Sequence, residues 1–140
     1  MISNFTIGDL TIDCANAGRA CDFYADLMDW EKTVAYGCLA LKTDNDLTIL
    51  FAETDIPYAP PVWPEEPGKQ QKQMHLYFTV DDVQAAVDKA IQLGATKAAA
   101  QYGGRRLPPR RHRRLFASAA LVRPAGEHAI FNTSIRGAMR

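Results

Sequence analysis

The sequence predicts an α+β fold built from two similar βαβββ modules, and three observations support this prediction. Residues 9–16, DLTIDCAN, alternate polar and apolar side chains as a half-buried strand does. An apolar stripe with helical spacing follows this strand. The same order of strand and stripe returns 63 residues later, in residues 75–94. Because each such unit is too small to bury its own sheet face, we expect the two modules to pack as a pair.

The first module is expected at about residues 7–56. Its helix, at about 17–29, carries apolar side chains at i, i+3, i+4, i+7 and i+8 from Ala20 onward, and Asn16 is placed to cap its start. Three runs with strand character follow: TVAYG, CLALKT and LTILFAE. Turn residues such as TDND separate them.

The second module is expected at about residues 73–134. It opens with the alternating run HLYFTV and continues into a helix at about 82–93 that ends at Gly94. The linker between the modules, at about 57–72, is rich in proline and has no periodic pattern. Its Tyr58 and Trp63 either close over a ligand or cover the edge of the core or a dimer seam.

Length and composition indicate a single globular domain over residues 1–140. The 47% hydrophobic and 23% charged residues are ordinary for such a domain. No stretch approaches the ~20 apolar residues of a membrane span, and the N-terminus does not resemble a signal peptide, so we expect a cytoplasmic protein without a membrane partner. The three cysteines, Cys14, Cys21 and Cys38, form no C-x-x-C pair and are expected to be reduced and buried.

Charge is distributed unevenly along the chain, although the net charge is zero. Residues 1–104 hold 7 Lys and Arg against 15 Asp and Glu, whereas residues 105–140 hold 9 against 1. Six arginines lie in RRLPPRRHRR, residues 105–114. Residues 105–122 are either a genuine basic loop, a segment read out of frame or a nucleic-acid-binding arm. The acidic body of the chain disfavours nucleic acid as a partner.

Three segments give the chain a family resemblance. FYADLMDW, MHLYFTVDDVQAAVDKAIQLGAT and RPAGEHAIF resemble the glyoxalase/bleomycin-resistance/dioxygenase superfamily, also called vicinal oxygen chelate proteins. The resemblance implies curved mixed sheets that enclose a cavity, helices on the outside, and homodimers in many members. Metal-dependent members hold a divalent ion with one ligand from the first and one from the last strand of each module, and that ion acts as a Lewis acid.

The resemblance also implies where such metal ligands would lie. The four positions fall on Asp9, Ala52, His75 and a residue near Ile130. Two of these have no donor atoms, and a catalytic site generally needs three protein ligands. An alignment shifted by one residue would instead bring in Glu53, Glu127 or His128. On the unshifted alignment we expect neither a bound metal nor another cofactor.

Strand alternation predicts the wall of a ligand pocket. The residues expected to line it are Asp9, Thr11, Asp13, Thr48, Leu50, Ala52, His75 and Tyr77, with Trp63 from the linker. Such a wall suits an organic ligand with several polar groups and some apolar surface; the alternative is that the interior is filled and these groups are merely solvated. If chemistry occurs, His75 is the expected general base, because its ordinary pKa of ~6.5 is close to neutral, and Tyr77 or Asp13 would assist.

Three functions remain open at this point. The first is a small-molecule-binding protein with a degenerate metal site, the second a divalent-metal-dependent lyase, isomerase or dioxygenase, and the third a protein that sequesters a drug or toxin without turnover. The sequence has no phosphate-binding loop, G-x-S-x-G elbow or H-E-x-x-H helix, so nucleotide hydrolysis, serine esterase activity and zincin-type proteolysis have no support. We expect a small organic ligand, and a homodimer that covers exposed sheet edges.

Overall fold

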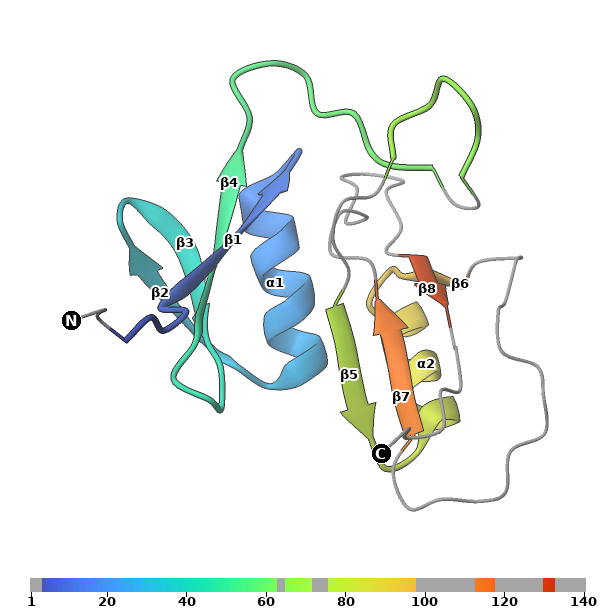
Figure 1. Ribbon diagram of the computed structural model, residues 1–140. Coiled ribbons are helices and arrows are strands. Elements are labelled where there is room, and N and C mark those ends of the chain that lie inside the picture. The colour runs from blue at the N-terminus through green and yellow to red at the C-terminus, as the bar shows by residue number, and fades with distance from the viewer. Residues whose placement is uncertain (1–3, 63–64, 72–75, 98–112, 118–129, 133–140) are drawn as a thin grey trace. The chain divides into compact units, whose positions relative to one another are not determined.

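The computed structural model describes residues 4–62, 65–71, 76–97, 113–117 and 130–132 of the chain. It divides the chain into two compact units, Met1–Tyr58 and Ala59–Arg140. Each unit combines a helix with a sheet, which confirms the α+β class (Figure 1). No helix of the described residues is long and apolar enough to cross a membrane. The predicted site residues Trp63 and His75 lie outside the described residues, as does most of the arginine-rich block.

The first unit contains a mixed sheet whose described strands have the order β1-β4-β3-β2. The strands are β1 (Asp9–Cys14), β2 (Glu31–Ala35), β3 (Cys38–Lys42) and β4 (Thr48–Glu53). Neighbours β2 and β3 are antiparallel, as are β3 and β4, whereas β1 lies parallel to β4. A parallel pair needs a long crossover connection, and here helix α1 together with β2 and β3 supplies it.

Helix α1 (Ala17–Met28) begins and ends as its sequence indicates. The backbone N–H of Arg19 donates to the side-chain oxygen of Asn16 at 2.9 Å, which confirms the predicted cap. The helix ends at Asp29, which has a left-handed backbone with φ of 56° and donates its N–H to the carbonyl of Ala25. The predicted helical boundaries are therefore correct to within about one residue.

The core of the first unit lies between α1 and the sheet. The rings of Tyr24 and Phe51 stack with their centroids 5.9 Å apart, and Phe23 meets Tyr24 edge to face at 5.1 Å. Cys14 and Cys21 are buried in this unit as reduced thiols, as predicted, but Cys38 is only half-buried. The apolar stripe of the sequence therefore faces the sheet, and burial of that stripe holds the unit together.

The second unit contains β5 (Leu76–Val80), α2 (Val83–Gln92), β6 (Thr96–Lys97), β7 (Arg113–Ala117) and β8 (Ile130–Asn132). Its helix begins at Asp82, whose carboxylate accepts from the backbone N–H of Ala85 at 3.0 Å. Gly94, with φ of 102°, follows the helix. Phe78 of β5 and Val87 of α2 are buried, so this helix and strand also follow the predicted pattern.

The strand order of the second unit is β5-β7-β8-β6, which differs from that of the first unit. Its first strand pairs antiparallel with its third, β7, whereas β1 pairs parallel with the fourth strand of its own unit. The repeat predicted from sequence therefore holds for the opening strand and helix, and a second βαβββ module is not confirmed. The alternating pattern that would specify the later strands is missing from the sequence after β6, where arginine and proline accumulate.

Candidate ligand-binding face

Helix α1 covers one face of the sheet in the first unit. Phe51 points to this side, because its ring stacks on Tyr24 of α1. Glu53 points there too, because its Oε1 accepts from the backbone N–H of Ala17, the first residue of the helix, at 3.0 Å. A carboxylate at a helix N-terminus is favourable, since it meets unpaired N–H groups and the positive end of the helix dipole.

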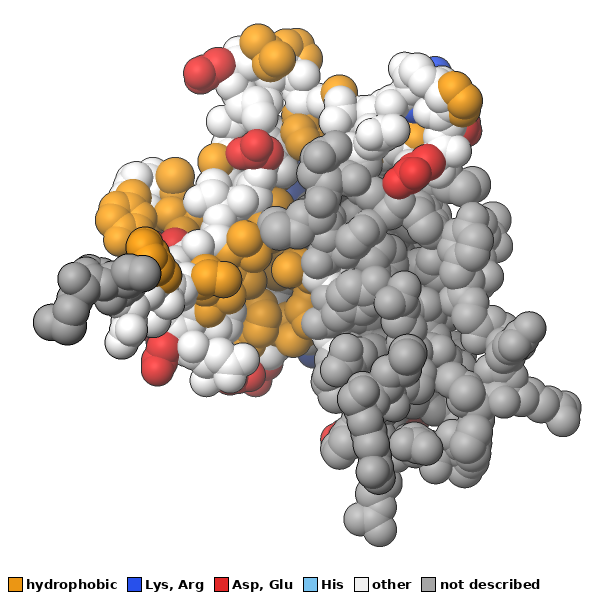
Figure 2. Space-filling model, in the orientation of Figure 1, with side chains coloured by type: hydrophobic (Ala, Val, Ile, Leu, Met, Phe, Trp, Pro, Cys, Tyr) orange, Lys and Arg blue, Asp and Glu red, His pale blue; other side chains and the backbone are white. Residues whose placement is uncertain are grey.

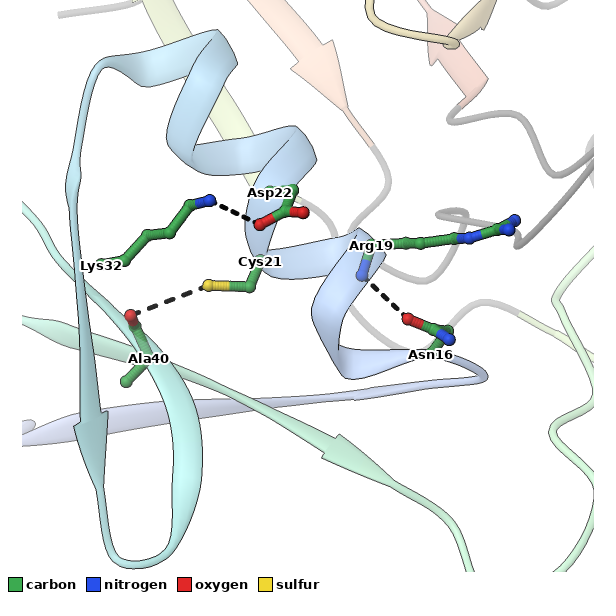
Figure 3. A network of polar contacts seen from close by, with 6 residues as sticks. All are labelled: Asn16, Arg19, Cys21, Asp22, Lys32 and Ala40. Atoms are coloured by element: carbon green, nitrogen blue, oxygen red, sulfur yellow. Dashed lines mark hydrogen bonds and ion pairs between the residues drawn. The ribbon is translucent and has the colours of Figure 1, made fainter.

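Polar contacts on the α1 side join the helix to the hairpin (Figure 3). Lys32 of β2 forms an ion pair with Asp22 of α1, with Nζ and Oδ1 2.6 Å apart, and both side chains are exposed. Nearby, the Sγ of Cys21 lies 3.8 Å from the carbonyl oxygen of Ala40. This side of the sheet is thus occupied by its own helix.

The opposite face of the same sheet, here called the distal face, carries six of the predicted site residues. Register partners in a sheet share a face, and alternate residues of a strand point to opposite faces. Leu50 and Ala52 flank Phe51 in β4, so they point away from α1. The six residues pair in register as Asp9 with Thr48, Thr11 with Leu50, and Asp13 with Ala52.

Exposure changes across the distal face from one strand to the next. Asp9, Thr11 and Asp13 of β1 are exposed. Thr48 and Ala52 of β4 are half-buried, and Leu50 between them is only 4% exposed. The face therefore presents the carboxylates and the hydroxyl of β1 to solvent beside the half-buried Thr48 and Ala52, whereas Leu50 is already covered.

Lys42 is a member of the distal face that the sequence prediction missed. It pairs in register with Thr48 on one side and with Glu31 on the other. Its Nζ lies 3.2 Å from Oε1 of Glu31, an exposed ion pair. The alternation of CLALKT places Lys42 on the same side as Ala40, so extending the analysis from β4 to β3 would have found this ammonium group.

Three side chains in the first unit have raised pKa values. Burial, and then the carboxylate of Asp22, raises the pKa of the Cys21 thiol. Burial also raises the pKa of Tyr24, with a smaller effect from Tyr58. The hydrogen bond to Asp22 is the main cause of the raised pKa of Lys32. All three belong to the α1 side of the unit.

The side chains at the four mapped ligand positions do not fit the metal site of the family that the sequence resembles. Ala52 has no donor atom, and neighbouring Glu53 is engaged with the N-terminus of α1. Ile130, the first residue of β8, has no donor atom either. Among the described residues, no three His, Cys, Asp or Glu side chains gather in a way that could hold a metal ion. His75 lies outside the described residues, so its place relative to Asp9 stays a prediction.

The remaining predicted wall residues belong to other parts of the chain. Tyr77 lies in β5 and pairs in register with Phe116 of β7. Trp63 and His75 are outside the described residues. The six residues that the sheet brings together all come from β1 and β4, and their assignment to a ligand pocket stays a prediction.

Comparison with known proteins gives the family. The model of the glyoxalase-like domain matches residues 9–128, from the first residue of β1 to a point just before β8. The chain belongs to the glyoxalase-like domain family. This confirms the superfamily indicated by the sequence segments. Among curated protein sequences, none matches the chain.

Two solved structures have a fold similar to that of this glyoxalase-like chain. One is the oxidase ChaP-H2, with 14% identity, a TM-score of 0.54, and 96% of each chain covered. Another is VPC_CASS1, from the mobile metagenome of V. Pseudocholerae, with 14% identity, a TM-score of 0.52, and 98% of this chain and 99% of that chain covered. At this identity the likeness is one of fold.

Proposed function

We propose that this glyoxalase-like protein binds a small organic ligand at the distal face, without the family's usual divalent-metal site. The observation that carries the proposal is the common face of Asp9, Thr11 and Asp13 with their partners on β4. The position of Glu53 supports it further, because the one acidic side chain at the end of β4 is bound to the N-terminus of α1.

The residues of the distal face indicate which ligand groups would be recognised. The carboxylates of Asp9 and Asp13 accept hydrogen bonds from hydroxyl or amino groups and attract positive charge. Ala52, half-buried beside these carboxylates, offers a small apolar surface to the hydrocarbon part of a ligand. Because Lys42 is already paired with Glu31, the face favours a ligand that donates hydrogen bonds over an anion.

Two further functions remain as alternatives to this proposal. A sequestering protein would hold the same ligand without turnover. An enzyme would use His75 as the general base, as the sequence predicts. A metal-dependent lyase, isomerase or dioxygenase would need ligands besides Asp9 and His75, and the mapped positions supply none.

Native mass spectrometry of the purified protein tests the ligand proposal. We expect a small molecule to co-purify with the wild-type chain, and Asp13→Asn combined with Thr11→Val to reduce its occupancy at least about fivefold, because one loses a charge and the other a hydroxyl. Asp26→Asn, an exposed change on α1, is the matched control and should retain the ligand. Equal occupancy in all three proteins, or none in the wild type, would contradict the proposal.

Elemental analysis after mild dialysis tests the metal alternative. We expect well under one equivalent of zinc, nickel, iron or manganese, because two ligands bind a divalent ion weakly. His75→Ala should alter ligand occupancy while leaving the far-ultraviolet circular dichroism unchanged. One equivalent of metal that disappears in His75→Ala would make the metalloenzyme the better assignment, and turnover of the co-purified molecule would distinguish an enzyme from a sequestering protein.

A further inference from the structure

Two large apolar side chains are exposed in residues 4–8, the segment that leads into β1. Phe5 is 88% exposed and Ile7 is 81% exposed. The backbone bond nearest to this segment joins the N–H of Thr48 to the carbonyl oxygen of Gly8 at 3.5 Å, so contact with the sheet begins at Gly8. Hydrophobic side chains are visible at the N-terminal end of the first unit in Figure 2. We call residues 4–8 the N-terminal arm.

The distal face is the side of β1 that the N-terminal arm can cover. Ile12 and Cys14, which point to the α1 side, are 4% and 2% exposed, so that side of the strand is already filled. On the distal side the residues of the strand are exposed: Asp9, Thr11 and Asp13. An arm that folds onto β1 therefore meets the proposed ligand site.

Gly8 is the point at which the arm can turn. An added Cβ there meets nothing within 4 Å, and glycine has the widest choice of backbone conformations. A chain that reverses at Gly8 runs back over β1 at roughly 3.3 Å per residue, the same rise as the strand itself. Phe5 stands three residues before Gly8, so it then lies over Thr11, three residues after Gly8.

We propose that the N-terminal arm closes over the distal face and forms the apolar wall of the ligand site, with Phe5 and Ile7 against the bound molecule. This inference rests on the proposed function. The strands β1 and β4 offer the ligand carboxylates and hydroxyls but little apolar surface, because Leu50 is covered and Ala52 is small and half-buried. The arm supplies the apolar surface that these strands lack.

The two surfaces together specify the chemical class of the ligand. The exposed carboxylates of Asp9 and Asp13 favour a protonated amine, which forms charge-assisted hydrogen bonds with them. The ring of Phe5 on the other side favours a flat apolar group, because paired aromatic rings attract each other beyond the burial of their area. The ligand is therefore an organic amine that carries an aromatic or hydrocarbon group.

The same surfaces explain why the arm is open in the protein without a ligand. Closing would place Phe5 and Ile7 against carboxylates and a hydroxyl, which gives little apolar burial. Such a contact does not offset the conformational entropy that is lost when the arm becomes ordered. A ligand with an apolar group gives the two side chains a surface against which they become buried.

Titration with two amines, followed by two-dimensional NMR, tests the apolar wall. Phenethylamine and ethanolamine share the ammonium group, and only the first carries a ring. We expect the wild-type chain to bind phenethylamine about tenfold more tightly, and Phe5→Ser combined with Ile7→Ser to remove most of this preference while leaving the dissociation constant of ethanolamine unchanged. Ile56→Ser, which changes another exposed apolar residue of the unit, is the matched control and should keep the preference.

Asp13→Asn separates this inference from the proposed function. It should weaken the binding of both amines, because each loses a charged partner. If neither amine binds, or if Asp13→Asn binds both as the wild type does, the ligand site itself is wrong, and so is the wall. If both amines depend on Asp13, but the preference for the ring is absent or survives in the arm variant, the role of the arm alone is overturned.

Cysteine pairs in a Cys38→Ser background test where the arm closes, since the other two thiols of the unit are buried. Under mild oxidation, Phe5→Cys with Thr11→Cys should form an intrachain disulfide about tenfold faster than Phe5→Cys with Leu10→Cys. The reason is direction, because strand alternation points Leu10 to the α1 side and Thr11 to the distal side. Equal rates, or a faster reaction at Leu10, would overturn closure over the distal face.

Discussion

The two units of this chain begin alike and end differently. Each opens with an alternating strand followed by an amphipathic helix that a side-chain oxygen caps at its first turn. In the first unit β1 then pairs parallel with β4, whereas in the second unit β5 pairs antiparallel with β7. The periodic sequence specified the opening strand and the helix in both units. The predicted module continued to its last strand only in the first unit, where alternating residues and turn residues extend as far as β4.

Among the described residues, the N-termini of the two helices are held differently. Asn16 caps α1, and Glu53 of β4 adds a second acceptor at Ala17, so the helix start is tied to the sheet. At α2, Asp82 acts as the cap from within the same segment. The hydrogen bond between the start of α1 and Glu53 of β4 thus occurs in the unit whose first and last strands, β1 and β4, are neighbours.

The largest expected effect on the free energy of unfolding comes from truncating a buried aromatic side chain in the core of each unit. Phe51→Ala should lower the free energy of unfolding by about 3–5 kcal/mol, because the ring is 1% exposed and stacks on Tyr24. Phe78→Ala in β5, where the ring is 8% exposed, should cost about 3 kcal/mol. Urea denaturation measures both values. Ile91→Ala on the exposed side of α2 is the control and should cost much less than either.

Amide hydrogen exchange on the same two variants shows how separate the units are. If they unfold as distinct units, Phe51→Ala lowers protection in residues 9–53 and Phe78→Ala lowers it in residues 76–97. An equal loss of protection across both units in both variants would mean that they unfold together, and the contrast between them would then concern topology alone.

A smaller effect is expected from the helix caps. Asp82→Ala should cost about 1 kcal/mol, because the first turn of α2 loses its carboxylate acceptor. Asn16→Ala should cost about half as much, because Glu53 still accepts from Ala17. Thermal unfolding followed by circular dichroism measures both. If Asn16→Ala costs more than Asp82→Ala, the bond from Glu53 does not support the helix in solution.

The smallest expected effect comes from the hydroxyl of Tyr24. This oxygen is buried and has no hydrogen-bond partner among the described residues. Tyr24→Phe should therefore change the free energy of unfolding by less than about 0.5 kcal/mol, or raise it, because a desolvated hydroxyl is removed while the ring keeps its stack on Phe51. Equilibrium denaturation provides the value. A loss above about 1 kcal/mol would reveal a partner for the hydroxyl in another part of the chain.

Individual residues show how far sequence reasoning reached. Asn16 was predicted as a cap and is one, because capping depends on a few adjacent residues. Lys42 was missed on the distal face, because its place there depends on pairing between β3 and β4. The engagement of Glu53 with Ala17 joins residues 36 positions apart, and no local pattern contains it.

The sequence alone determined the α+β class, both helices with their caps, the faces of β1 and β4, and the family. Each of these follows from local periodicity, from short capping patterns or from segments that resemble the family. Only the tertiary structure decided the strand order of each sheet, the membership of Lys42 in the distal face and the occupation of Glu53. These depend on which distant segments pair, and a chain resolves that choice through burial and hydrogen bonding of the whole sheet rather than through the preference of any one segment.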